Sequence, residues 1–228
     1  VHRLSTRDGR AAVLKVQYPG VRESIDSDVD NLASLLRVSG LLPKHMDMSP
    51  LLAEAKSQLH EETDYEQEAR YLNAFARALG DDERFLLPRV IPSLSSSRIL
   101  GMTFVPGQPI EDVAHADASE RNRVAALLFE LFMIELFDLR LVQTDPNFAN
   151  YQYNAETGQV VLLDFGASRR FKASLVRGYR DLLAGAVAGD RPAMIEAAES
   201  IGYQLGPDNS LYQQLSLIHI SEPTRPPE

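Results

Sequence analysis

Apolar and polar residues alternate at the start of the chain and then change to a helical spacing. Residues 1–17 alternate on both sides of an Asp-Gly turn, which predicts a β-hairpin. From Val21 to Ser39, apolar residues recur every three or four positions, which predicts a helix. A second helix is predicted to begin with Ser49 as its N-cap, followed by a proline, and to run towards Gly80.

Strands and helices follow one another in the rest of the chain. The pattern predicts, in order, strands at 85–90 and 97–105, a helix at 118–139, two short strands around a tight turn at 154–158, and helices at 171–188 and 191–203. The helix at 118–139 is apolar almost all round, so we expect it to be central and buried. This order predicts an α+β fold with two lobes, a small sheet-containing lobe at 1–107 and a mainly helical lobe at 108–214.

Composition narrows the class of protein and its partners. The chain has 228 residues, of which 44% are hydrophobic and 24% charged, as in a globular protein. A net charge of −9 without a long basic run argues against nucleic-acid binding. The absence of cysteine excludes a disulfide framework and a cysteine-ligated metal site. No apolar run approaches the length of about 18 residues that a transmembrane helix needs, and no signal peptide opens the chain. We therefore expect a cytoplasmic protein, with any membrane contact peripheral.

Both ends of the chain depart from the pattern of a natural domain. The first residue is Val1 instead of methionine, and the first residues have the pattern of the middle of a strand. Residues 215–228 include the run LIHISEPTRPPE, which carries three prolines and breaks from the preceding pattern. This segment is expected to be a non-native tail, such as translated adapter sequence, and a natural disordered tail is the alternative.

Three polar residues stand at defined spacing between Val142 and Ala167. Asp145 is followed five residues later by Asn150, and Asp164 heads an Asp-Phe-Gly triplet after an apolar run. The loop and hairpin between them place two Asp and one Asn around one point. Phosphoryl transfer needs a carboxylate that orients the nucleophile and two oxygen ligands for Mg²⁺. Asp-x-x-x-x-Asn followed by Asp-Phe-Gly is also the protein-kinase signature, so ATP and Mg²⁺ are the expected cofactors.

A lysine and an acidic run could complete this chemistry. Lys15 lies in a predicted strand, where an outward-pointing side chain is the commoner arrangement. The Asp-Phe-Gly triplet favours an inward lysine, because kinases use a strand lysine to hold the α- and β-phosphates. In the acidic run, Glu61 and Glu66 read as a solvated helix face. Glu62, Asp64 and Glu68 are less easily assigned to solvent, and Glu68 lies beside the apolar stripe, where it could pair with an inward lysine.

The strand predicted at 97–105 ends in a bend that precedes Pro106 and Gly107. A kinase hinge would run here between the lobes and offer backbone groups to adenine. Thr103, Phe104 and Val105 are therefore predicted to contact the nucleotide, and a plain strand–loop junction is the alternative. The histidines show no paired metal-ligand spacing, so no zinc site is expected.

Four motifs in order resemble the UbiB-type atypical kinase family, also called AarF-like. They cover about 1–203 and read VLKVQYPGV around Lys15, HEETDYEQEA around Glu62 to Glu68, QTDPNFANY from Asp145 to Asn150, and LLDFGA at Asp164. The resemblance implies a protein-kinase-like fold with an inserted helix at 21–39. It also implies a role for each motif residue: Lys15 contacts phosphate, Glu68 is its ion-pair partner, Asp145 is the catalytic-loop acid, Asn150 and Asp164 bind Mg²⁺, and Glu62 and Asp64 form the Glu-x-Asp motif.

The resemblance also carries expectations about substrate and partners. Proteins of this family are associated with ubiquinone or other isoprenoid-lipid metabolism, so lipids or proteins of such a pathway are the expected partners. Its members are thought to act as ATPases or as kinases on small molecules more than on proteins.

Three features depart from the family or from protein kinases in general. The family's Lys-x-Gly-Gln extension and its alanine-rich phosphate-covering loop would precede Val1 and are not in this chain. Gln143 and Thr144 stand where most protein kinases have His-Arg. No Ala-Pro-Glu follows Gly166, so the platform for a peptide substrate is missing. The last two features disfavour a protein substrate.

The sequence thus favours an ATP- and Mg²⁺-dependent atypical kinase or ATPase that acts on a small-molecule or lipid-pathway substrate. A nucleotide-binding regulatory module of the pseudokinase type, without turnover, is the second hypothesis. The third is an inactive fragment that binds nucleotide weakly because the phosphate-covering loop is absent.

Overall fold

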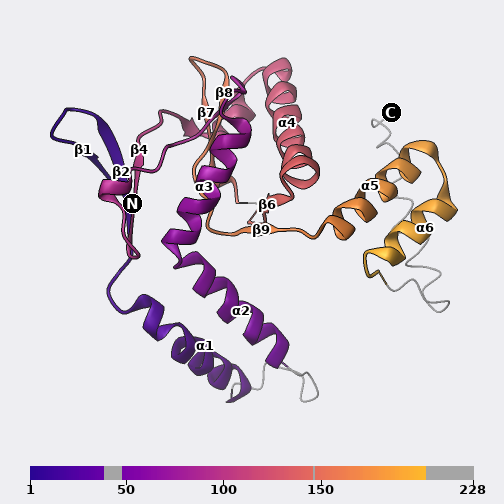
Figure 1. The fold of residues 1–228 in the computed structure, drawn as a ribbon, viewed down its shortest axis with the longest axis horizontal. Helices are drawn as coiled ribbons and strands as arrows, with labels where there is room; N and C mark the ends of the chain where they lie inside the picture. The colour runs from indigo at the N-terminus through magenta and orange to yellow at the C-terminus, as the bar shows by residue number, and fades with distance from the viewer. Residues whose placement is uncertain (39–47, 146, 204–228) are drawn as a thin grey trace. The chain divides into compact units, whose positions relative to one another are not determined.

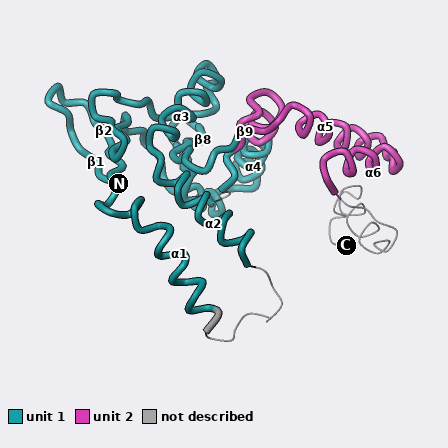
Figure 2. Tube along the Cα trace, turned by 60° about the horizontal axis from the view of Figure 1, so that its bottom comes forward, with its two compact units in different colours: residues 1–130, 143–169 teal, residues 131–142, 170–228 magenta. Residues whose placement is uncertain are grey.

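The computed structural model of the chain describes residues 1–38, 48–145 and 147–203 (Figure 1). The predicted helix end at Ser39, the end of the predicted helical lobe at 204–214 and the tail at 215–228 lie outside these residues. The chain divides into two compact units, which are residues 1–130 with 143–169 and residues 131–142 with 170–228 (Figure 2). These units do not follow the lobes predicted at 1–107 and 108–214, which stay a prediction.

The first sheet of unit 1 contains the predicted N-terminal hairpin. Its strands are β1 (His2–Ser5), β2 (Ala11–Val16) and β4 (Ile99–Thr103), antiparallel in the order β1-β2-β4. Gly9 has a φ of 81° in the hairpin turn, a conformation that suits glycine because it has no Cβ. Lys15 pairs with Leu100 across the β2–β4 ladder, so the hairpin and β4 together fix the position of this lysine.

Three helices follow β2, and two predictions about them are wrong. They are α1 (Val21–Val38), α2 (Ser49–Glu62) and α3 (Tyr65–Leu79), with α1 and α2 side by side (Figure 1). The single helix predicted from Ser49 towards Gly80 is broken after Glu62, because the Asp64 carboxylate accepts a hydrogen bond from the Gln67 N–H at 2.8 Å and caps a new helix. The N-cap of α2 is Met48 instead of Ser49.

The second sheet of unit 1 supports the loop that carries Asp164. Its strands are β3 (Phe85–Leu86), β8 (Gln159–Leu162), β7 (Tyr151–Asn154) and β5 (Gln108–Pro109), in the order β3-β8-β7-β5. The hairpin predicted around 154–158 is confirmed as the β7–β8 pair. The strand predicted at 85–90 shortens to β3, which pairs with β8 in parallel. A 3₁₀ helix η1 (Pro92–Leu94) lies between β3 and β4. Prolines in this segment interrupt the strand because they lack the N–H that a ladder needs.

The long apolar helix is exposed on one side. It consists of α4 (Ala118–Met133) and a π-helix η3 (Ile134–Leu139), and a separate 3₁₀ helix η2 (Ile110–His115) precedes it. Val124 and Leu127 are buried, whereas Phe129 is 61% and Phe132 45% exposed. The expected burial on all sides is therefore wrong for these two phenylalanines. A sequence that is apolar all round does not require burial all round, because folded proteins also expose apolar atoms.

The remaining elements follow the π-helix. They are β6 (Leu141–Gln143), a 3₁₀ helix η4 (Phe148–Asn150), β9 (Ser168–Arg170), α5 (Ala173–Ala188) and α6 (Arg191–Ser200). The sequence pattern predicted both helices but missed β9, which pairs with β6. Within unit 2, Leu182 of α5 packs against Met194 and Ala198 of α6. No helix among the described residues is long and apolar enough to cross a membrane.

Candidate functional site

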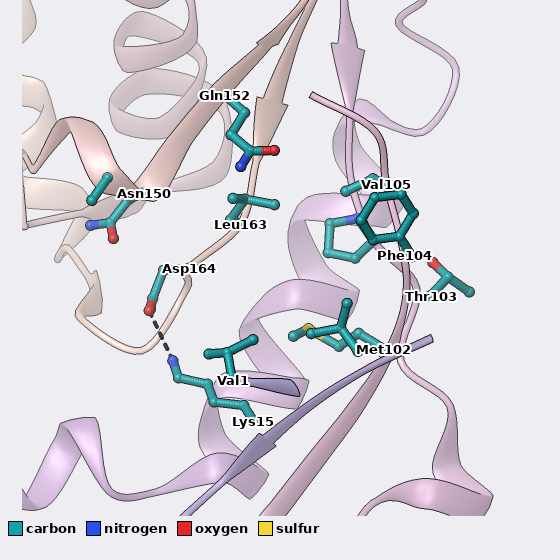
Figure 3. A pocket seen from close by; sticks show the side chains of 13 residues that line it. Val1, Lys15, Met102, Thr103, Phe104, Val105, Asn150, Gln152, Leu163 and Asp164 are labelled. Carbon is teal, nitrogen blue, oxygen red and sulfur yellow. Dashed lines mark hydrogen bonds and ion pairs between the residues drawn. The ribbon is translucent and has the colours of Figure 1, made fainter. Parts of the chain in front are cut away.

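Lys15 lies between two carboxylates in unit 1. Its Nζ donates to both Glu68 oxygens at 2.9 Å and to Asp164 Oδ2 at 2.8 Å (Figure 3 shows the bond to Asp164). The Lys15 side chain is 21% exposed, Glu68 is 1% exposed and Asp164 is 36% exposed. The strand β2, the helix α3 and the segment after β8 thus meet at one ammonium group. The predicted Lys15–Glu68 contact is present, and Asp164 joins it.

Burial and charge oppose one another at this ammonium. Burial lowers the pKa of Lys15, but the negative charges of Glu68 and Asp164 outweigh it and hold the pKa above its ordinary value. Burial also raises the pKa of the Glu68 carboxyl, against the effect of Lys15. Because the ammonium lies 2.9 Å from both Glu68 oxygens, we assign the proton to Lys15. The site therefore presents a cation that is held in place by buried and half-buried carboxylates.

Asp145 and Asn150 lie together on the polar loop before β7. Asn150 Nδ2 donates to Asp145 Oδ2 at 2.9 Å and to the Asp145 backbone oxygen at 3.2 Å. The Leu163 N–H donates to the Asn150 backbone oxygen at 3.0 Å, which connects this loop to the residue before Asp164. The amide nitrogen of Asn150 is used within the loop, so its Oδ1 is the atom that could bind a cation.

The Asp-Phe-Gly triplet is anchored on both sides. The Gly166 N–H donates to Asp164 Oδ1 at 2.9 Å. The Phe165 side chain is 2% exposed, and its ring centroid lies 5.0 Å from that of Phe75 on α3. A turn hydrogen bond to the Asp164 carboxylate and a packed Phe165 ring therefore hold the triplet.

A cavity of ≈ 290 Å³ opens beside Lys15 and Asp164 (Figure 3). The predicted nucleotide contacts Thr103, Phe104 and Val105 line one wall, and Asn150 and Leu163 line another. Figure 3 shows these two groups on opposite sides of the space. The cavity has apolar side chains such as Phe104 and Val105 on one wall and the polar groups of Lys15 and Asp164 at its edge, as in ligand pockets that combine an apolar lining with a few polar groups.

A second cavity of ≈ 230 Å³ shares Lys15 and Asp164 with the first. Asp145 and Glu62 also line it, so three carboxylates and one ammonium face this space. Glu62 is exposed at the end of α2. Asp64, the other residue of the predicted Glu-x-Asp motif, does not line this cavity and instead caps α3. The two motif residues thus have different surroundings.

Sequence reasoning missed two residues that contact the site or its exit. Gln143 Nε2 donates to the Asp164 backbone oxygen at 2.9 Å, although its position was noted only as a departure from His-Arg. Arg169 lies on β9, and its guanidinium is 2.9 Å from Glu54 and 3.4 Å from Glu61 on α2. Glu61 therefore has an ion-pair partner in addition to solvent. No local sequence signal links residues so far apart.

The side-chain oxygens near the first cavity suit a metal ion that substrate phosphates also bind. Among the described residues, no group of three or more His, Asp or Glu side chains could hold a metal ion by itself. Asn150 and Asp164 offer two oxygen ligands beside the first cavity. Mg²⁺ is commonly bound through one or two protein oxygens together with substrate phosphates and water. The residues present therefore fit Mg²⁺ that arrives with a nucleotide.

Comparisons with known proteins point to one family. A model of the ABC1 atypical kinase-like domain matches residues 1–198. Over 217 residues, 93% of this chain, the sequence is 39% identical to atypical kinase coq-8, mitochondrial, of Caenorhabditis elegans. It is 37% identical over 99% of the chain to atypical kinase COQ8, mitochondrial, of Saccharomyces cerevisiae. The chain spans 29% and 46% of these relatives' lengths, respectively.

A solved structure supports the fold. The complex of Rv3197 with erythromycin from Mycobacterium tuberculosis superposes with a TM-score of 0.68 at 25% sequence identity, over 96% of this chain and 57% of that chain. Together with the domain match, this likeness confirms the α+β, protein-kinase-like fold that the sequence predicted.

Proposed function

We propose a function from the premise that the chain belongs to the ABC1 atypical kinase-like family, as the match over residues 1–198 shows. The chain forms the nucleotide- and metal-binding part of an atypical kinase or ATPase, which transfers the terminal phosphoryl group of ATP with Mg²⁺. The acceptor is a small molecule, a lipid-pathway intermediate or water. The observation that carries this proposal is the ion pair of Lys15 with Glu68 and Asp164 at the edge of a base-sized cavity.

Lys15 and Glu68 supply a fixed positive charge for the phosphates. Glu68 is 1% exposed and holds the ammonium through both carboxylate oxygens. A charge that is already in place needs no reorganisation when negative charge develops during the reaction. Lys15 can exchange its bond to Asp164 for bonds to phosphate while Glu68 keeps it in position. Thr103, Phe104 and Val105 line the far wall of the cavity, where they would contact the base.

Asn150 and Asp164 would hold Mg²⁺ when it is bound with the nucleotide. The metal neutralises phosphate charge when it is bound. Asp145 orients the acceptor hydroxyl or a water molecule from the second cavity, which it lines together with Glu62. Its hydrogen bond with Asn150 Nδ2 at 2.9 Å sets the direction of its carboxylate. Positioning and electrostatics together account for catalysis of this type.

A small-molecule or lipid-pathway acceptor fits this chain better than a protein. The exit from the Asp-Phe-Gly triplet continues directly into the short strand β9 and the helix α5, without the Ala-Pro-Glu platform that holds a peptide. The relatives from C. elegans and S. cerevisiae carry the word mitochondrial in their names, so the cytoplasmic location expected from the sequence stays a prediction. All the predicted catalytic residue types are present, so a module without turnover is not favoured.

The substitution Asp164→Asn tests this proposal. It removes the anionic metal ligand with little change in shape, and we expect it to abolish Mg²⁺-dependent ATP hydrolysis in the full-length protein, measured as phosphate release. Asp190→Asn is the matched control, because Asp190 caps α6 in unit 2 and asparagine caps helices equally well. Activity of Asp164→Asn within a few-fold of the parent protein would refute the role of Asp164.

A further inference from the structure

One glutamine side chain joins the two acidic segments of the site. Gln143 is the last residue of β6, two positions before Asp145. Its Oε1 accepts a hydrogen bond from the Asp145 N–H at 3.1 Å. Its Nε2 donates to the Asp164 backbone oxygen at 2.9 Å. A single planar amide thus contacts the backbone of both aspartates to which the proposed function gives roles.

The neighbouring residue strengthens the same connection. The Thr144 N–H and hydroxyl both donate to the backbone oxygen of Ala167, at 3.2 Å and 2.6 Å. On the other side of the loop, the Leu163 N–H donates to Asn150. The catalytic loop and the Asp-Phe-Gly segment are therefore held together through Gln143, Thr144 and Asn150. Gln143 is the member whose side chain reaches both aspartates.

We infer that Gln143 is a positioning residue that sets the distance and direction between Asp145 and Asp164, an inference that rests on the proposed function of this site. Glutamine suits the task because its amide carries a donor and an acceptor at once and no charge. A glutamate could still accept from Asp145 but would place a negative oxygen against the Asp164 carbonyl. A leucine of similar size would lose both bonds.

Gln143 should affect the geometry of the site more than the stability of the fold. Reacting groups in phosphoryl transfer must be held close to their productive arrangement, and a displacement of about 1 Å can cost a hundredfold in rate. Gln143 does not line either cavity. Its loss should therefore spare the binding of nucleotide without metal and act on turnover.

The test compares three variants of the full-length protein. In Gln143→Leu and Gln143→Glu, we expect kcat for Mg²⁺-dependent ATP hydrolysis to fall by about tenfold to a hundredfold. We expect the affinity for ATP without Mg²⁺ to stay within about twofold, since no cavity-lining residue changes. Gln159→Leu is the matched control, because Gln159 also donates to a backbone oxygen, that of Glu83 at 3.0 Å, and accepts from the Thr157 hydroxyl at 2.8 Å. It should keep the parent rate.

Hydrogen exchange of the Asp145 amide separates the two bonds and does not depend on activity. In Gln143→Leu this amide should exchange about tenfold faster, because its acceptor is gone. In Gln143→Glu it should stay protected, although kcat falls. Unchanged kcat in Gln143→Leu, or unchanged protection of the Asp145 amide, would overturn the inference. If the parent protein shows no ATP turnover, the proposed function fails. The hydrogen exchange of Gln143→Leu then decides the positioning role by itself. Lost protection of the Asp145 amide supports this role, and retained protection overturns it.

Discussion

Lys15 shows how a single residue acquires its role from its neighbours. Most lysines in short strands extend into solvent, and its position in β2 gives no reason for another orientation. Glu68 and Asp164 approach it from segments 53 and 149 positions away in the sequence. Burying a lysine is unfavourable unless a carboxylate compensates, and here two do. The same contacts that make the buried ammonium tolerable place it at the edge of the cavity.

Glu120 provides a residue-scale prediction about pH. Arg123 and the Tyr153 hydroxyl donate to its carboxylate and lower its pKa from 4.5 to about 2. Because the folded state binds this proton less tightly than the unfolded state, the contribution of Glu120 to stability is full above about pH 4.5 and is lost as the pH falls towards 2. We expect Glu120→Gln to lower the urea midpoint at pH 6, with the difference from the parent shrinking by pH 2.5.

The control for this experiment is Glu196→Gln, which changes an exposed glutamate in the interior of α6, away from the first turn. Its midpoint should follow that of the parent protein at both pH values. A Glu120→Gln deficit that is the same at pH 6 and pH 2.5 would contradict the assigned cause, because protonation would then play no part in it.

At the scale of elements, the break between α2 and α3 has a structural consequence. α2 ends at its C-cap Thr63 and Asp64 caps α3, so Glu68 lies in the first turn of α3, where it meets Lys15. α2, on the other side of the break, presents Glu54 and Glu61 to Arg169 of β9. One helix thus holds the lysine and the other holds the segment that leaves the Asp-Phe-Gly triplet. In a continuous helix from Ser49, no cap would separate the part that contacts Arg169 from the part that contacts Lys15.

The link between α2 and β9 should be measurable as a salt-sensitive coupling. A double-mutant cycle of Arg169→Ala and Glu54→Ala should give about 0.2–1 kcal/mol at low salt, as for partly exposed ion pairs. The side chains are 37% and 59% exposed, so screening at about 1 M salt should reduce this value. The measurement is urea denaturation at both salt concentrations.

Arg98 and Glu23 form a matched pair for comparison, because both side chains are 62% exposed and lie 3.1 Å apart. Their coupling should be the smaller of the two. A coupling between Arg169 and Glu54 that salt leaves unchanged would exclude an electrostatic link between α2 and β9.

On the scale of the whole molecule, the site belongs to one compact unit. Every residue with a proposed role lies within residues 1–130 or 143–169. The walls of the larger cavity come from the first sheet on one side and from residues around β7 and β8 on the other. A ligand in this cavity would therefore contact two separate sheets of unit 1.

This arrangement predicts that nucleotide stabilises the protein. At a free ATP concentration of a hundred times Kd, with Mg²⁺ present, the free energy of unfolding should rise by about 2.7 kcal/mol. The increase is measured as a rise in melting temperature with ATP concentration. Lys15→Met should reduce the rise, because the phosphates lose their cation. A melting temperature that does not respond to millimolar ATP would contradict nucleotide binding by this chain.

Much of the fold and of the site was predictable because the relevant signals are local. The Asp-Gly turn, the three- and four-residue spacing of 21–38 and the hairpin around 154–158 each depend on neighbouring residues. The family motifs likewise place Lys15, Asp145 and Asp164 in order along the chain. By contrast, the pairing of β3 with β8 and the one-sided burial of α4 depend on what packs against each element. Periodicity reports a helix or strand, not its partner.

The sequence by itself predicted most of the helices and strands, the family resemblance and the residues that we propose for the centre of the site. The tertiary structure decided that Asp164 shares Lys15 with Glu68, that Asp64 is a helix cap, and that Gln143 bridges both aspartate segments. The physical reason is that hydrogen bonds and ion pairs act over about 3 Å of space and leave no trace in sequence spacing when the chain folds back between the partners.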